Sequence, residues 1–231
     1  MKIDLHVHTK ISSPCSSIKI TQMIDYARHI GLDAICVTDH DTLHGAILAQ
    51  KIGKEKNFPV FKGMEINTYE GDFLVFGLEK DIGKPLSARE LLDLVSSSGG
   101  AAIVAHPYRP FERALKDKVY SIKGFNALEV ENGNTSPEYN KLAQSASFKL
   151  SLPGTGGSDA HQLWEIGRYY TRFDHTITSE QELVEAIKSG NYQAKTGASN
   201  VLNYNQEAVT NYSYHKEKIN EQPVSYLRQL I

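Results

Sequence analysis

Residues 34–41 read Ala-Ile-Cys-Val-Thr-Asp-His-Asp, an apolar run that stops abruptly at three polar side chains. The run over 34–38 is short and rich in apolar and β-branched residues, which predicts a buried strand. A helical pattern follows it from 43 to about 56, and another precedes it over 20–30 and ends at Gly31. This part of the chain therefore predicts a helix, a buried strand and a second helix in succession.

The same alternation continues along the rest of the chain. Further strands are predicted at residues 2–8, 59–66, 73–76, 101–105, 127–131, 150–155 and 169–173. The strands over 59–66 and 73–76 are candidates for a pair joined by a turn at Gly71. Helix starts are indicated by capping boxes at residues 87–90 and 179–182, and by Ser136 followed by Pro137. Roughly seven strands with intervening helices predict a mostly parallel, right-handed βα array. A closed or nearly closed barrel is favoured over an open doubly wound sheet.

The overall composition is that of an ordinary globular protein. The 231 residues carry a net charge of -2, so we expect no stable binding to nucleic acid. Cys15 and Cys36 are too few for a disulfide framework. No apolar run approaches the ~20 residues of a membrane span, and the first residues lack the apolar core of a secretory signal. We therefore expect one cytoplasmic domain over residues 1–231, without membrane contact.

The C-terminal segment 200–231 is polar and rich in tyrosine, with Tyr204, Tyr212, Tyr214 and Tyr226. It is expected either to pack across the outside of the barrel or to mediate self-association. A homo-oligomer is therefore one of two open expectations.

Two histidines close the first predicted strand. His6 and His8 stand two residues apart, so their imidazoles point to the same face of the strand. Two neutral imidazoles at that spacing can bind one metal ion. The alternative is a pair of histidines that line the barrel and are held only by hydrogen bonds.

Polar residues also follow other predicted strands. His40 and Asp41 come after the strand of residues 34–38, Glu65 ends a strand, and His106 follows another. A carboxylate or imidazole at the end of an apolar strand is costly unless it is paired or binds a cation. The alternatives are a loop histidine beside a helix-capping aspartate, and a surface glutamate on an edge strand.

The glycine-rich segment 154–157 leads to a last pair of polar residues. Asp159 and His161 are again two residues apart, after a loop whose backbone can approach a ligand closely. Arg109 lies three residues after His106, and its planar guanidinium suits a phosphate or a carboxylate. A plain glycine turn with a capping aspartate, and an exposed loop arginine, are the alternatives.

In a barrel the ends of separate strands converge on one mouth, where such enzymes carry out their chemistry. The side chains expected to meet there are His6, His8, His40, Glu65, His106, Asp159 and His161. A set of nitrogen and oxygen ligands without thiolate suits Zn, Mn or Fe rather than a soft copper site. The histidines interpreted as surface or structural residues are His29, His44, His175 and His215.

The order and spacing of these motifs resemble the PHP family (polymerase and histidinol phosphatase). The matching segments, between residues 3 and 173, are His6-x-His8, Thr38-Asp39-His40-Asp41, Gly63-Met64-Glu65-Ile66, Ala105-His106-Pro107 and Ser158-Asp159-Ala160-His161. The resemblance implies a distorted (β/α)7 barrel of the TIM-barrel type, with its site at the C-terminal ends of the strands. It also implies two or three divalent metal ions and phosphoesterase activity on small phosphate esters or nucleotides.

The resemblance further implies a role for each position. The side chains implied for one metal are His6, His8, Glu65 and Asp159. Glu65 would bridge this metal to a second one, which His106 also binds. His40 and His161 would hold a third metal, and Arg109 resembles the residue that binds the substrate phosphate.

Two features depart from the family's pattern. Ser13 stands where members with three metals carry Asp or His. Residues 66–105 contain no histidine, although the family carries one between the positions of Glu65 and His106. The candidates to replace the missing ligands are Cys15, Asp72, Glu129 and Glu131.

The implied mechanism is attack on phosphorus by a metal-activated water, with Arg109 and the metals neutralising the developing charge. Asp159, His161 and Asp41 are the candidates to protonate the leaving alkoxide. Two other functions stay open, namely an amidohydrolase-like C–N hydrolase and a degenerate barrel that binds metal or nucleotide without catalysis. Within the phosphoesterase hypothesis, short oligonucleotides are a second substrate class, although the mild acidity favours small substrates.

Overall fold

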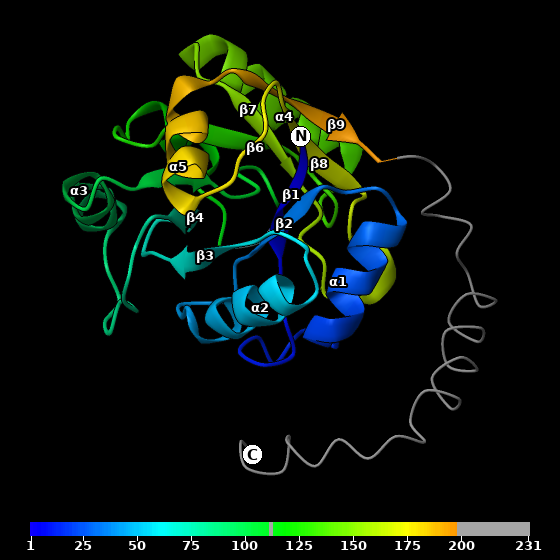
Figure 1. Cartoon of the computed structure of the whole chain (residues 1–231). Coiled ribbons are helices and arrows are strands. Elements are labelled where there is room, and N and C mark those ends of the chain that lie inside the picture. The colour runs from blue at the N-terminus through cyan, green and yellow to red at the C-terminus, as the bar shows by residue number, and fades with distance from the viewer. Residues whose placement is uncertain (111–112, 198–231) are drawn as a thin grey trace, which may run out of the picture. The chain divides into compact units, whose positions relative to one another are not determined.

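The computed structural model describes residues 1–110 and 113–197, which form a single sheet wrapped into a barrel with helices around it (Figure 1). The strands are β1 (Lys2–Val7), β2 (Ala34–Val37), β3 (Val60–Asn67), β4 (Asp72–Phe76), β5 (Ala101–Val104), β6 (Ala127–Asn132), β7 (Gly154–Gly157), β8 (Tyr169–Phe173) and β9 (Tyr192–Thr196). Their order in the sheet is β7-β6-β5-β4-β3-β2-β1-β8-β9. The tyrosine-rich segment 200–231, and the self-association expected of it, lie outside the described residues.

The predicted barrel is confirmed, and so is the pairing of 59–66 with 73–76 through the turn at Gly71, but the sheet has more strands than expected. β1, β2 and β3 pair in parallel, as do β5, β6 and β7, whereas β4 runs antiparallel to both β3 and β5. β3 and β4 form a hairpin, which necessarily reverses the chain. Within the described residues the sheet has nine strands rather than seven, because β8 and β9 extend it beside β1 as an antiparallel pair. The connection between these two strands contains a helix, Glu180–Ser189. Only Tyr192 is buried in β9, so this strand has little apolar pattern to predict it from.

A short contact closes the barrel beyond the ends of the strands. Val7 and Ala160 form an isolated parallel bridge, which joins β1 to the segment that follows β7. The backbone N–H of His8 donates to the carbonyl of Ala160 at 3.1 Å as part of this contact. The first and seventh strands therefore meet at the end of the barrel where the parallel strands finish.

In the part of the chain that the structure describes, five α-helices pack around the sheet. They are α1 (Ile20–His29), α2 (His44–Glu55), α3 (Ala88–Ser97), α4 (Pro137–Leu150) and α5 (Glu180–Ser189). The capping box predicted for α3 is present: Ser87 Oγ accepts from the N–H of Glu90, whose carboxylate accepts from the N–H of Ser87. None of the helices in the described ranges has the length and hydropathy that a membrane span requires.

Two local predictions are corrected by the structure. Ser179 caps α5 through the N–H of Glu182, but the Glu182 carboxylate accepts from the N–H of Thr178, so the second capping box is incomplete. The strand predicted over 150–155 begins only at Gly154, because α4 continues as far as Leu150. Packing of α4 on β6 keeps the end of this apolar segment helical.

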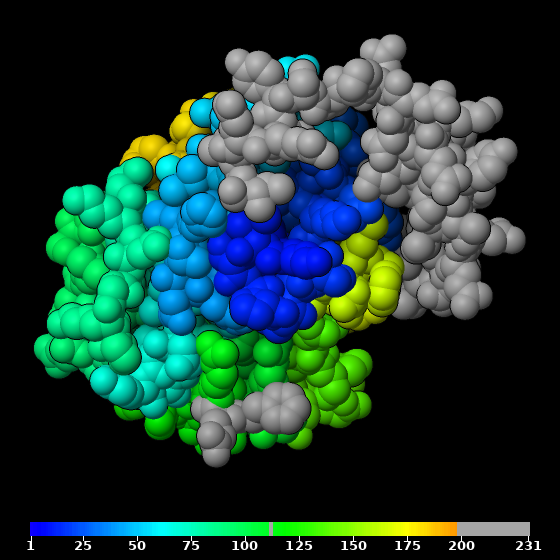
Figure 2. Space-filling view, turned by 90° about the horizontal axis from the view of Figure 1, so that it is seen from below, coloured from blue at the N-terminus to red at the C-terminus, as the bar shows by residue number. Residues whose placement is uncertain are grey.

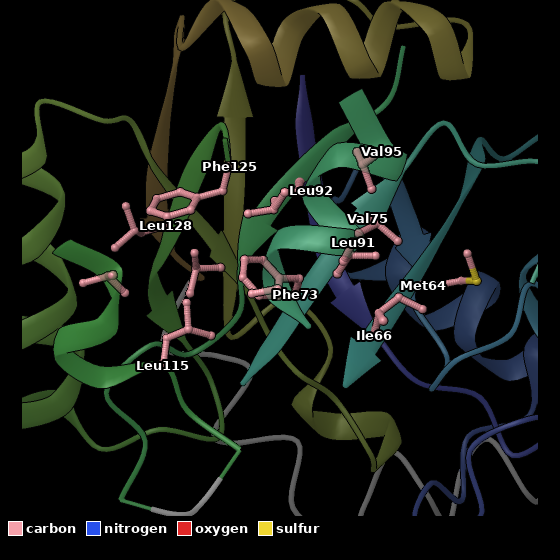
Figure 3. Packing of buried hydrophobic residues seen from close by; sticks show 14 of the residues in the cluster. Met64, Ile66, Phe73, Val75, Leu91, Leu92, Val95, Leu115, Phe125 and Leu128 are labelled. Atoms are coloured by element: carbon pink, nitrogen blue, oxygen red, sulfur yellow. The ribbon is translucent and has the colours of Figure 1, made fainter. Parts of the chain in front are cut away.

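An outer apolar cluster lies between the sheet and the helices α3 and α4 (Figure 3). Met64 and Phe73 project from β3 and β4 toward this layer, and Leu91 and Leu92 of α3 belong to the same cluster. Leu91 and Phe73 are fully buried. Burying such a side chain stabilises the fold by about 1.5–3 kcal/mol, so this layer holds the helices against the sheet.

An inner apolar cluster fills the end of the barrel where the parallel strands begin. Ile3 and Phe61 lie near the starts of β1 and β3, and they share this cluster with Leu183 and Ile187 of α5. Helix α5 therefore covers this end of the barrel. The opposite end holds buried polar side chains instead, among them His6, His8 and Glu65. Figure 2 views the molecule from below, with the N-terminal part of the chain in blue near the centre.

A shift in the pairing register of β1 lies between its apolar first half and the histidines at its end. The register of β1 beside β2 shifts between Asp4 and Val7. Leu5 belongs to the inner apolar cluster, whereas His6 and His8 lie among the polar side chains. In a regular strand Leu5 and His6 would point to opposite faces, so the shift allows both to face inward, as bulges next to functional sites often do.

Candidate metal centre

Four buried side chains converge where the parallel strands finish. His6 and His8 come from β1 and its end, Glu65 comes from β3, and Asp159 follows β7. Glu65 Oε2 lies 3.4 Å from His6 Nε2 and 3.2 Å from His8 Nε2. Asp159 Oδ1 lies 3.4 Å and 3.3 Å from the same two nitrogens. One ligand atom from each of the four lies within 4.8 Å of the others, and we call this set the first group.

The orientation of His6 is set by Glu129 on β6. His6 Nδ1 lies 3.0 Å from Glu129 Oε1, and both side chains are buried. Glu129 Oε2 accepts from the backbone N–H of His106 and from Asn132 Nδ2, each at 2.9 Å. A carboxylate beside Nδ1 keeps a proton on that nitrogen, so Nε2 is the atom that His6 offers to a cation.

Ser13 orients His8 in the same way. Ser13 Oγ donates to Asp39 Oδ1 at 2.7 Å, and Asp39 also accepts from the N–H and the hydroxyl of Thr9, each at 2.6 Å. Since the hydroxyl hydrogen of Ser13 is used, the contact of 3.3 Å between Ser13 Oγ and His8 Nδ1 is one in which His8 donates. His8 therefore presents Nε2 to the first group, 3.1 Å from His6 Nε2.

A second group shares Glu65 with the first. Glu65 Oε1, the oxygen turned away from the first group, lies 2.8 Å from His106 Nε2. Asp72 Oδ2, at the start of β4, lies 4.0 Å from the same nitrogen. Glu65, Asp72 and His106 are all buried and offer ligand atoms within 4.8 Å of one another.

A third group is made of histidines alone. His8, His40 and His161 offer ligand atoms within 4.8 Å of one another, and the rings of His40 and His161 each lie 4.5 Å from that of His8 between centroids. His40 Nδ1 lies 3.1 Å from Glu65 Oε2, and its Nε2 lies 3.5 Å from the thiol of Cys15. His40 and His161 are partly exposed, so the third group is the most open to solvent.

The backbone turns sharply where several of these residues leave their strands. Asp41, His106 and Asp159 have φ angles of 58°, 29° and 52°, in the left-handed region that non-glycine residues rarely adopt. Such conformations cost about 1–3 kcal/mol each and concentrate at functional sites. The turns at His106 and Asp159 bring an imidazole and a carboxylate back over the mouth of the barrel.

The clustered carboxylates make this mouth strongly attractive to cations. Burial alone would lower the pKa of His6, but Asp159, Glu129 and Glu65 outweigh it and raise that pKa well above its ordinary value. Burial alone would raise the pKa values of Glu65 and Asp159, but the charge of His6 and contacts from other nearby cationic groups hold both well below their usual range. The proton added to His6 sits on Nε2, the position a metal ion would take. The donor set therefore fits a divalent metal ion.

Arg109 lies against the outer face of the first group. One terminal nitrogen of its guanidinium contacts Asp159 Oδ2 and lies 3.3 Å from Asn132 Oδ1. Asp159 thus turns Oδ1 toward His6 and His8 and Oδ2 toward Arg109. The Arg109 side chain is 20% exposed, and its Nε makes no hydrogen bond within the described part of the chain. This Nε is itself buried, so the exposed part of Arg109 lies elsewhere on the side chain.

Asp41 lies outside the three groups. Its side chain accepts from the N–H of Asn67 at 3.2 Å, and its own N–H donates to the carbonyl of Glu65. These contacts tie the loop after β2 to the end of β3. The histidines found exposed and outside the groups are His29, His44 and His175, while His215 lies outside the described residues.

The sequence reasoning did not identify the side chains that orient the histidines. The sequence pattern indicates Glu129 only as a substitute ligand and Ser13 only as a departure from the family's pattern, and it gives no indication of a role for Asn132. The signal for Glu129 was present, because an acidic residue between Leu128 and Val130 in a buried strand requires a partner. Ser13 gave no such signal, since a serine in a loop needs no partner.

Known proteins with similar sequences place the chain in a family. It is 35% identical over 141 residues to the uncharacterized protein MJ1587 of Methanocaldococcus jannaschii, covering 57% of this chain and 82% of that protein. It is 30% identical over 182 residues to MJ0417 of the same organism, covering 75% and 70%. A sequence profile described as PHP-associated matches residues 137–192. The chain belongs to the PHP family.

Solved structures share the fold of this PHP chain. A protein of Bifidobacterium adolescentis, provisionally described as a metal-dependent phosphoesterase, aligns with a TM-score of 0.59 at 18% identity, covering 69% of this chain and 87% of that one. An amidohydrolase from Chromobacterium violaceum aligns with a TM-score of 0.61 at 16% identity, covering 87% and 99%. At these identities the likeness shows a common fold alone.

One relative of this PHP chain carries a specific enzyme name. A phosphoribosyl 1,2-cyclic phosphate 1,2-diphosphodiesterase of Eggerthella lenta is 28% identical over 89 residues. The match covers 37% of this chain and 33% of that enzyme.

Proposed function

We propose that this protein is a metal-dependent phosphoesterase that hydrolyses a small phosphate ester or a nucleotide. The observation that carries the proposal is the meeting of three groups of metal-binding side chains with Arg109 at one mouth of the barrel. The names of the Eggerthella lenta diphosphodiesterase and the Bifidobacterium adolescentis protein support hydrolysis of a phosphate ester.

The side chains at the mouth would have different roles in the proposed reaction. His6, His8, Glu65 and Asp159 would hold one metal ion, and Glu65 with His106 would hold a second. Bound divalent ions supply a nucleophile by lowering the pKa of water, and they neutralise charge on the phosphoryl oxygens. The partly exposed guanidinium of Arg109 would add positive charge beside these oxygens. Zn, Mn and Fe all suit this set of ligands.

Of the three candidates to protonate the leaving alkoxide, His161 is the best placed. Burial and the nearby His8 lower the pKa of His161, which reduces the protonated fraction that this role requires. Both carboxylate oxygens of Asp159 are engaged, Oδ1 with the histidines and Oδ2 with Arg109, so Asp159 holds its negative charge. Asp41 lies outside the groups and is held by the N–H of Asn67. The side chain of His161 is 22% exposed and lies beside the first group. This role excludes His161 from binding a metal through the same nitrogen.

Chemistry on C–N bonds is less well supported by the side chains. The group shared between the first and second sets is the carboxylate of Glu65, and Arg109 offers a cation to an anionic substrate. Lys62, on the same strand as Glu65, is paired with Glu180 at the start of α5, away from the mouth. With metal ions bound, Arg109 would add to the positive charge at the mouth, which favours a phosphate ester over a neutral amide.

A substrate screen with a matched control tests the proposal. The full chain is loaded with Mn²⁺ or Zn²⁺ and assayed on phosphomonoesters, nucleotides, cyclic phosphates, short oligonucleotides, amides and ureas. We expect phosphate release from a small ester or nucleotide, and loss of that release in His8→Ala but not in His175→Ala, which alters an exposed histidine. Full metal occupancy with no turnover of any phosphate ester, or turnover of amides alone, would contradict the proposal.

A further inference from the structure

Asp72 is placed at the mouth of the barrel by the direction of β4. Because β4 runs antiparallel to β3, its first residue pairs with the last residue of β3, Asn67. Asp72 therefore begins β4 at the end of the barrel where β3, the strand that carries Glu65, finishes. A parallel β4 would have placed Asp72 at the opposite end, among the inner apolar residues.

The surroundings of Asp72 combine two buried carboxylates with one imidazole. Asp72 and Glu65 are each 2% exposed, and both approach Nε2 of His106, at 4.0 Å and 2.8 Å. Burial of two anions beside a single imidazole is costly unless a further cation neutralises them. The partners that Asp72 has are Asn67 Nδ2 at 2.7 Å and Arg113 Nε at 3.2 Å, and the Arg113 side chain is 48% exposed.

The sequence motifs supply too few ligands for a second metal ion. Residues 66–105 contain no histidine, so the second group has only Glu65 and His106 from the motifs that defined the site. We propose that Asp72 supplies the missing ligand and holds the second cation together with these two residues. Its carboxylate gives the second site more oxygen character than an imidazole would, which favours Mn²⁺. This inference rests on the metal dependence of the proposed function and not on its substrate.

A purely structural role for Asp72 makes a different prediction. If Asp72 served only to anchor Arg113, removal of either partner would have the same effect on the protein. If Asp72 binds a cation, Arg113 competes with that cation for the same carboxylate. Removal of Asp72 and removal of Arg113 should then change metal affinity in opposite directions.

The experiment is a Mn²⁺ titration of the metal-stripped full chain, followed by elemental analysis and electron paramagnetic resonance. We expect at least two Mn²⁺ ions per wild-type chain, with exchange coupling between ions bridged by Glu65. Asp72→Asn, close in shape to the natural side chain, should bind one ion fewer or bind it at least about 10-fold more weakly, and lose the coupling. Arg113→Gln should keep the ion count and bind the second ion more tightly.

Three outcomes would overturn the inference. They are a single uncoupled Mn²⁺ in the wild type, an unchanged titration of Asp72→Asn, and equal losses in Asp72→Asn and Arg113→Gln. Should Asp72→Asn fail to fold, Arg113→Gln decides, because only competition for a cation predicts tighter binding of the second ion. None of these measurements requires turnover. Inactivity on phosphate esters would therefore contradict the proposed function without changing the number of metal ions bound per chain.

Discussion

Glu129 Oε1 lies 3.0 Å from His6 Nδ1, and the two side chains are buried although 123 residues separate them in the chain. Glu129 is not a member of the first group. It acts on metal binding by fixing which nitrogen of His6 faces the cation. Changes to residues that orient a metal ligand typically weaken metal binding 10–100-fold.

The first prediction concerns this pair. Glu129→Gln should bind metal at the first group about 10-fold to 100-fold more weakly, because the amide can donate to Nδ1 and move the histidine proton to Nε2. The measurement is metal affinity by calorimetry. Glu131→Gln is the matched control, since Glu131 lies two residues further along β6 and contacts Gln144 and Asn140 instead. Equal losses in both variants would show that the effect is not specific to His6.

Ser13 should contribute to metal binding without being a ligand. Ser13→Ala removes the acceptor for His8 Nδ1 and the donor to Asp39, so we expect metal affinity to fall about 10-fold with no change in the number of ions. Titration with elemental analysis measures both quantities. Ser145→Ala, on the exposed face of α4, should leave both unchanged. Loss of a whole ion in Ser13→Ala would show that Ser13 is itself a ligand.

Arg109 should act on substrate rather than on metal. Arg109→Gln should raise KM for phosphate substrates by about 10-fold or more, because a charge-assisted donor to the phosphate is lost. Metal content should be retained, since Asp159 keeps its negative charge. Steady-state kinetics and elemental analysis check the two parts of the prediction. The exposed Arg89→Gln, whose contact with Asp93 is at 4.0 Å, serves as the control.

Metal binding should weaken as the pH falls. The pKa values of His6 and His8 are raised, because nearby carboxylates outweigh the effect of burial. A cation must displace these protons, so a lower pH increases the protonated fraction and lowers the affinity, by up to about 10-fold per pH unit for each proton displaced. Calorimetry in buffers of different ionisation enthalpy counts the protons released. An affinity that stays constant from about pH 8 to about pH 6 would contradict this prediction.

The helix layer outside the barrel should depend on Leu91. Leu91→Ala should lower the free energy of unfolding by about 2–5 kcal/mol, because Leu91 is fully buried in the outer cluster. Leu94→Ala on the same helix should change it by about 0.5 kcal/mol or less, since Leu94 is 39% exposed. Chemical denaturation monitored by circular dichroism compares the two variants. Similar losses would place the stabilising contacts of α3 elsewhere.

The barrel and the convergence of its polar residues could be anticipated from local patterns. An apolar run followed at once by a polar residue, as at residues 34–41 or 101–106, indicates a buried strand that ends at a functional surface. The spacing of His6 and His8 places both imidazoles on one face. These inferences need only the short-range geometry of strands, which residue types and spacing largely specify.

The surroundings of Asp72 and the partners of the histidines were decided only by the tertiary structure. The turn at Gly71 indicated that 59–66 and 73–76 could pair, but the approach of Asp72 to His106 also depends on the pairing of β4 with β5. Glu129 and Ser13 acquire their roles from contacts with His6 and His8 that depend on how separate strands and loops pack. Residue types and spacing therefore determined which side chains come to the end of a strand, whereas the closure of the barrel determined which atoms they meet there.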